Sequence, residues 1–203
     1  MRTQRGAIGT IVLLAGLVGL GWGIWPAPQV THTLEISPAQ MVVPGDAASA
    51  VMERRRMTLI FPAWLRAGET AQVRMTFEPL PAKADLPQKV DVTRRYAVFT
   101  RASLDLPGLE VTPAGPAGQI LSPGKPVTFW WVLEGAQAGN FDGTAWLSLR
   151  FDPLDGREPL MQALAAPRMN VKVRRFLGLG GPAGRFAGGA AGVVGLLLLV
   201  RRR

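Results

Sequence analysis

The 203-residue sequence contains no cysteine and a single histidine, His32. Without cysteine the chain forms no disulfide and no thiolate metal site, although this absence leaves the redox compartment open. One histidine is too few for a zinc site built from several imidazoles. A Ser-His-Asp arrangement would require His32, and no motif ties a serine or aspartate to it, so we interpret it as a surface histidine. The composition predicts a noncatalytic protein with no cofactor and no metal site.

Acidic residues are missing from both ends of the chain, because all 14 lie between Glu35 and Glu158. Residues 26–176 contain 17 basic residues, so their net charge is only +3 (17 − 14), against +9 for the whole chain. The other six basic residues flank apolar runs: Arg2, Arg5, Arg185, Arg201, Arg202 and Arg203. Such residues orient membrane helices, whereas nucleic-acid binding requires a basic face on the domain. We therefore predict no nucleic-acid partner.

Two long runs are almost free of charge. Residues 6–25 read GAIGTIVLLAGLVGLGWGIW, and residues 177–200 end in GVVGLLLLV. At a rise of 1.5 Å per residue, about 20 helical residues cross a hydrocarbon core of about 30 Å. The two runs predict transmembrane helices, with a cleaved signal peptide as the alternative for residues 6–25.

The short basic tails predict the orientation of these helices. Residues 1–5 and 201–203 are expected in the cytoplasm and residues 26–176 outside it, in an extracytoplasmic or periplasmic domain. The chain is thus predicted to be a two-pass protein of the cytoplasmic (inner) membrane, with the membrane as one partner.

Small residues recur every four positions in both runs, which places them on one helix face and permits close backbone approach. The predicted helix-packing residues are Ala15, Gly19, Gly23, Gly184, Gly188 and Gly192. We expect an intramolecular helix pair, and homodimerisation through either stripe is the alternative.

Between the runs, short segments alternate apolar and polar residues, with proline and glycine between them. The clearest are residues 71–77, 96–106, 127–134, 144–151 and 168–176, and weaker ones are 33–37, 56–61 and 109–112. A period of two is typical of half-buried strands. About seven or eight such strands without a helical period predict an all-β domain, an immunoglobulin-like antiparallel β-sandwich flanked by two transmembrane helices. A small barrel is the alternative closure.

Aromatic residues gather in two of these strands. We expect four of them to fill the core between the sheets: Phe129, Trp131, Trp146 and Phe151. Trp130 follows the opposite parity to Trp131, so an exposed Trp130 is a candidate partner contact. The ERRR motif adds three candidates for contact with anionic lipid heads or an acidic partner, Arg54, Arg55 and Arg56, with a solvated strand face or loop as the alternative.

The segment FDPLDGREP concentrates three carboxylates, Asp152, Asp155 and Glu158. Their spacing matches no calcium loop, and Asp155-Gly156 is typical of a hairpin turn, so we interpret the segment as a solvated turn. A hydrolase that uses paired carboxylates alone is a further alternative function for the chain, with no particular carboxylates assigned to it.

Together these features predict an interaction or accessory subunit of an envelope or membrane assembly, bound to another envelope or membrane protein. Residues 177–203 also resemble the tripartite carboxy-terminal sorting tails of some bacterial envelope proteins, since Gly180-Gly181 precedes an apolar helix and an arginine cluster. They differ in carrying Pro182 and Arg185 after the glycines. The resemblance implies an alternative: a secreted or surface protein with a cleaved signal peptide and a tail processed at Gly180-Gly181.

Overall fold

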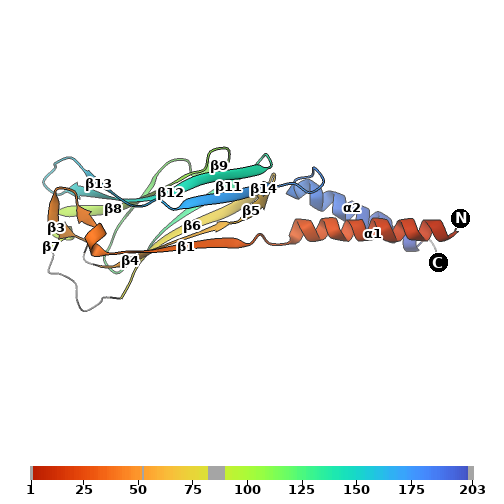
Figure 1. Ribbon diagram of the computed structural model, residues 1–203, viewed down its shortest axis with the longest axis horizontal. Helices are drawn as coiled ribbons and strands as arrows, with labels where there is room; N and C mark the ends of the chain where they lie inside the picture. The colour runs from red at the N-terminus through yellow and green to blue at the C-terminus, as the bar shows by residue number, and fades with distance from the viewer. Residues whose placement is uncertain (1, 52, 82–89, 201–203) are drawn as a thin grey trace.

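A computed structural model describes residues 2–51, 53–81 and 90–200 of the chain. An elongated β-sandwich forms one part of the molecule, and two packed helices extend from one end of it (Figure 1). The helices are α1 (Arg2–Ile24) and α2 (Gly181–Val200), and two 3-10 turns are η1 (Pro38–Gln40) and η2 (Val92–Arg94). Residues 201–203, the predicted arginine tail, lie outside the described residues.

The sandwich consists of two main sheets. Sheet 1 contains, in spatial order, β1 (Gln29–Ile36), β4 (Arg55–Pro62), β6 (Thr70–Pro79), β11 (Val127–Glu134) and β9 (Glu110–Thr112). Sheet 2 contains β10 (Ala117–Ile120), β8 (Tyr96–Asp105), β12 (Gly139–Pro153), β14 (Arg168–Arg174) and β5 (Trp64–Arg66), with β13 (Leu160–Ala165) also paired to β12. A small third sheet joins β2 (Val42–Val43), β3 (Asp46–Ala50) and β7 (Val90–Asp91).

The connectivity is that of an immunoglobulin sandwich. In the constant-type fold, strands A, B, E and D form one sheet and strands C, F and G the other. The strands β4-β6-β11-β9 and β8-β12-β14 reproduce these sheets in spatial order and in chain order. Strand β4 leaves sheet 1 at Ala63 and continues as β5, which pairs in parallel with β14 of sheet 2. The predicted antiparallel β-sandwich is therefore confirmed.

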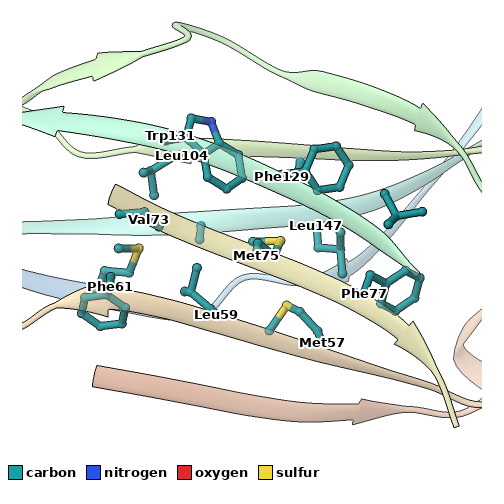
Figure 2. Close-up of a cluster of buried hydrophobic side chains, with 14 of the residues drawn as sticks. Met57, Leu59, Phe61, Val73, Met75, Phe77, Leu104, Phe129, Trp131 and Leu147 are labelled. Atoms are coloured by element: carbon teal, nitrogen blue, oxygen red, sulfur yellow. The ribbon is translucent and has the colours of Figure 1, made fainter. Parts of the chain in front are cut away.

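The core lies between the two sheets and is built by strict alternation. In β6, Val73, Met75 and Phe77 are buried, whereas Gln72 and Arg74 point to solvent. Figure 2 shows the inward side chains of β4, β6 and β11 meeting those of the opposing sheet. Each fully buried large apolar side chain contributes about 1.5–3 kcal/mol relative to an exposed one. This packing fixes which residues of each strand remain available on the outer faces.

The flanking helices correct the predicted fold class. Among the residues that the structure describes, no helix combines the length and the apolarity needed to cross a membrane. In α2, six glycines, Pro182 and the charged Arg185 lower the apolarity of the helix. On this finding the two transmembrane spans and the two-pass localisation in the inner membrane are wrong. The extracytoplasmic placement of residues 26–176 rested on those spans and falls with them.

The two helices instead form an intramolecular pair with close backbone contact. A Cβ atom on Gly188 would lie 2.8 Å from the Leu20 nitrogen, and one on Gly16 would lie 2.8 Å from the Cα of Gly192. Such approaches require glycine because any larger side chain would separate the helices. The outward faces of the pair carry exposed apolar side chains, among them Leu17 and Phe186.

The structure places most of the predicted helix-packing residues in this contact, with a shifted register on α1. Gly19, Gly23, Gly184 and Gly188 are buried where the helices meet. On α1, Ala15 is exposed and the neighbouring Gly16 takes the contact position. The closely spaced contacts extend along α2 to Gly195, whose added Cβ would lie 2.6 Å from the Leu13 nitrogen.

A cluster of aromatic and charged residues joins the helix pair to the sandwich. The Arg66 guanidinium lies 5.3 Å from the Trp22 ring and 5.0 Å from the Trp64 ring, and these two rings stack at 5.3 Å. Arg66 also donates to the carbonyl oxygens of Trp22 and Trp25 at the end of α1, where a cation complements the helix dipole. Glu69 accepts hydrogen bonds from both Arg66 and Arg185. We call this cluster the junction, and it consists of Trp22, Trp25, Trp64, Arg66, Glu69 and Arg185.

Candidate interaction surface

Trp130 lies on the outer face of sheet 1 with 51% of its surface exposed, while the adjacent Trp131 is only 1% exposed. Directly opposite Trp130 on β6 is Arg74, whose Cζ atom lies 5.3 Å from the centroid of the Trp130 ring. Val132, the next outward residue of β11, is also exposed. The structure therefore places the predicted contact residue Trp130 on the surface, where its ring makes a cation–π interaction with Arg74.

The side chains in the rows beside this pair are mostly neutral. Register pairing places four threonines side by side across sheet 1, one on each of four strands: Thr33, Thr58, Thr76 and Thr128. The cross-strand row that contains Trp130 continues through Arg74 on β6 and Ile60 on β4 to Thr31 on β1. Threonine pairs of this kind stabilise a sheet face and present hydroxyl and methyl groups together. We call Trp130, Arg74, Val132, Ile60 and the threonine row the sheet 1 face.

Charged residues border this face at its end away from the helices. Arg56 lies between Glu35 and Glu78 in one cross-strand row, and it pairs with Glu35 at 3.3 Å and with Glu78 at 3.8 Å. Arg54 also binds Glu35, at 2.6 Å. Arg54 and Arg56 are thus partly exposed cations at the rim of the face, already paired within the chain.

Arg55 lies inside the sandwich, with none of its side chain exposed. Its guanidinium donates to the carbonyl oxygens of Ser122 and Lys125, both at 3.0 Å, and it also binds Glu53. The same group lies 5.2 Å from the Phe77 ring. Arg55 therefore connects β4 to the loop before β11 and presents no surface to a partner.

Trp146 lies on the outer face of sheet 2 with 49% of its surface exposed, so the prediction that it fills the core is wrong. Its neighbours Ala145 and Leu147 point inward, and strand geometry forces Trp146 outward. The other three predicted core aromatics, Phe129, Trp131 and Phe151, are buried as expected. Two tryptophans of similar exposure thus stand on opposite faces of one domain.

His32, Asp152 and Asp155, which the sequence singled out for possible chemistry, each contact a different residue. His32 lies on β1 with its ring 5.4 Å from that of Phe61. Asp152 pairs with Arg150 and Asp155 with Arg157, each within one turn or strand end. No set of three or more potential metal ligands gathers among the described residues. For Asp155, the hydrogen bonds from Arg157 lower the carboxyl pKa below its ordinary value of 3.8.

Gly180 and Gly181, the position of the processing alternative, lie against the sandwich at the junction. The Gly181 nitrogen donates to the Ala67 carbonyl oxygen at 3.0 Å, and Gly181 is buried. A protease would have to displace α2 from the sandwich to reach the peptide bond between Gly180 and Gly181.

Sequence reasoning missed the residues that depend on pairing between distant strands. Arg74 is 56 positions from Trp130 in number, and only the register of β6 against β11 brings the two together. The junction residues Trp22, Trp64 and Arg66 were likewise outside the predicted set. The sequence contained one indication of Arg74, since the alternation in residues 71–77 places its side chain on the outer face of the strand.

Comparisons with known proteins give no family for this chain. No family model matches it, and no curated protein matches. Solved structures do share parts of its shape. The PapD-like domain 7 of human CEP192 matches with a TM-score of 0.34 and 8% identity, covering 71% of this chain and 86% of that one.

Two further solved structures are similar at the same low level. AggA, the major subunit of aggregative adherence fimbriae type I from Escherichia coli, has a TM-score of 0.28 and 7% identity, over 74% of this chain and 98% of that one. A superoxide reductase (neelaredoxin) from Ignicoccus hospitalis has a TM-score of 0.27 and 18% identity, over 57% of this chain and 77% of that one. At these values the likenesses do not bear on function.

Proposed function

We propose that the protein is a noncatalytic interaction module, an accessory subunit that joins a larger protein assembly through the sheet 1 face. The observation that carries this proposal is the half-exposed Trp130 held against Arg74. Tryptophan and arginine are the residues most enriched at the energetic centres of protein interfaces.

The surroundings of Trp130 support a protein partner. Val132 adds exposed apolar surface beside Trp130 on β11, half-buried Ile60 lies on the far side of Arg74, and the threonine row adds neutral hydroxyl groups. Charged pairs lie at the rim, with Arg54, Arg56 and Glu35 among them. An apolar centre with a polar rim is the usual anatomy of a protein interface. The charges of this rim have both signs, which favours a protein over a nucleic acid.

The experiment compares Trp130→Ala with Trp146→Ala in the full-length tagged protein, purified from its native cells. We expect a stoichiometric companion with the parent chain and with Trp146→Ala. Trp130→Ala should lose it by tenfold or more, because a central tryptophan contributes about 2 kcal/mol or more to binding. Thermal melting of both variants checks that each remains folded.

Equal retention of the companion by both variants would show that the sheet 1 face is not the binding surface. The same conclusion follows if Trp146→Ala alone loses the companion. Arg74→Ala is the second variant on the face, and it should weaken binding without lowering the melting temperature, since Arg74 is exposed.

A further inference from the structure

A second surface feature lies at the end of the sandwich opposite the helices, where η2 meets the turn between β12 and β13 (Figure 1). An open cavity of about 480 Å³ is lined there by Arg94, Arg95, Leu154, Asp155 and Arg157. Three of these five side chains are guanidinium groups, and they come from two segments about 60 positions apart. No part of this cavity belongs to the sheet 1 face.

Backbone hydrogen bonds hold the two segments in a fixed relation. The Leu154 nitrogen donates to the Arg95 carbonyl oxygen at 2.9 Å, which ties the turn to the residue after η2. The Arg95 nitrogen donates to the Val92 oxygen at 3.0 Å and closes η2. The turn itself is closed by Gly156, whose φ of 80° favours glycine. The three arginines therefore extend from a rigid frame.

The carboxylates nearby do not use all the donors of these arginines. Asp155 accepts from the Nε of Arg157 at 2.8 Å, and the Tyr96 hydroxyl also hydrogen-bonds to the Arg157 side chain. Asp46 lies 3.7 Å from one terminal nitrogen of Arg95, too long for a strong hydrogen bond. Arg94 is exposed and makes no ion pair within the described part of the chain. The guanidinium groups of Arg94, Arg95 and Arg157 therefore line the cavity together with the Asp155 carboxylate.

We infer that this cavity is a binding site for a ligand carrying an oxyanion group, a carboxylate or a phosphate, which bridges Arg94 and Arg157. Guanidinium groups match both anions through paired N–H donors, and such charge-assisted hydrogen bonds are about twice as strong as neutral ones. Leu154, which is exposed at the cavity wall, supplies an apolar contact for the rest of the ligand. Asp155 competes with the ligand for Arg157 and so limits its affinity.

The test titrates the full-length protein with inorganic phosphate, with succinate and with chloride at matched ionic strength, and follows the arginine Nε–H signals by NMR. We expect saturable shifts of Arg94 and Arg157 with phosphate or succinate and none with chloride. Saturation by phosphate alone identifies a phosphate ligand, and saturation by succinate alone identifies a carboxylate ligand. Either result supports the site, and the absence of saturation with both would overturn it.

Three variants sharpen this test. Arg94→Gln and Arg157→Gln should each weaken binding about tenfold, since each removes one charge-assisted contact. Asp155→Asn should strengthen binding several-fold, because it removes the competing carboxylate. Arg168→Gln is the matched control, an exposed arginine outside the cavity, and should bind like the parent. An equal loss in Arg168→Gln, or weaker binding in Asp155→Asn, contradicts the inference, and neither outcome depends on the sheet 1 face.

Discussion

At the scale of single residues, the buried Arg55 stabilises the sandwich by joining β4 to the loop before β11. Replacing it with methionine keeps most of the volume but removes the guanidinium that donates to Glu53 and to the carbonyl oxygens of Phe77, Ser122 and Lys125. Leaving a buried acceptor without its donor costs about 1–3 kcal/mol. We expect Arg55→Met to lower the free energy of unfolding by that amount in urea denaturation. The neighbouring Arg56→Met, half exposed, should cost less than about 1 kcal/mol, and equal losses would refute the buried role of Arg55.

The ion pair of Asp155 and Arg157 makes a second prediction at this scale. Because hydrogen bonds from Arg157 lower the pKa of Asp155, the carboxylate form is favoured in the folded chain. The stabilisation is present above the ordinary pKa of 3.8 and is lost as the pH falls through the lower folded value. NMR titration of the Asp155 carboxyl should give a midpoint below 3.8 in the parent. Arg157→Gln should move it upward, and an unchanged midpoint would contradict the pairing.

Residue parity in the strands was the part of the sequence that could be interpreted most directly. Alternation places Trp131 inside and Trp130 outside, as the structure has them. The same rule placed Trp146 outside, between inward Ala145 and Leu147, and the wrong prediction came from giving ring size more weight than parity. Alternation also places Arg55 inside the sandwich, where a charged side chain is unexpected. Its burial is tolerated because carbonyl oxygens accept hydrogen bonds from the guanidinium.

At the scale of elements, the helix pair depends on which glycines face the partner helix. A side chain on Gly188 meets the backbone of α1, whereas Gly189 has open space around its Cβ position. Gly188→Ala should therefore push the helices apart and speed hydrogen exchange of α2 amides at least tenfold. Gly189→Ala should slow that exchange or leave it unchanged, because alanine favours a helix by about 1 kcal/mol over glycine. Similar exchange in both variants would contradict the packing.

The elements divide into those with a local signal and those without one. The five clearest predicted segments correspond to β6, β8, β11, β12 and β14, because long strands with one buried face carry a period of two. Short strands such as β5 and β10 exist through pairing with distant neighbours, and a single sequence does not encode that register locally. The two apolar runs were correctly expected as helices, but the prediction that they span a membrane is wrong on the finding above.

At the scale of the whole molecule, the junction sets the direction of the helix pair relative to the sandwich. Glu69 connects Arg66 of the sandwich to Arg185 of α2, so Glu69→Gln weakens both ion pairs at once. We expect a broader distribution of distances between spin labels on α2 and β8. The chain has no cysteine, so labels attach only at introduced sites. Glu78→Gln, on the sheet 1 rim, is the control and should leave the distribution as narrow as in the parent, and a narrow distribution in Glu69→Gln would contradict this role.

The two outer faces of the sandwich provide the most direct measurement of the central claim. A photo-crosslinking side chain placed at position 130 or at position 146 samples the two faces of the same folded domain in its native cells. We expect one dominant protein adduct from position 130 and no matching adduct from position 146. Adducts of the same protein and equal yield from both positions, or from position 146 alone, would contradict a partner bound on the sheet 1 face.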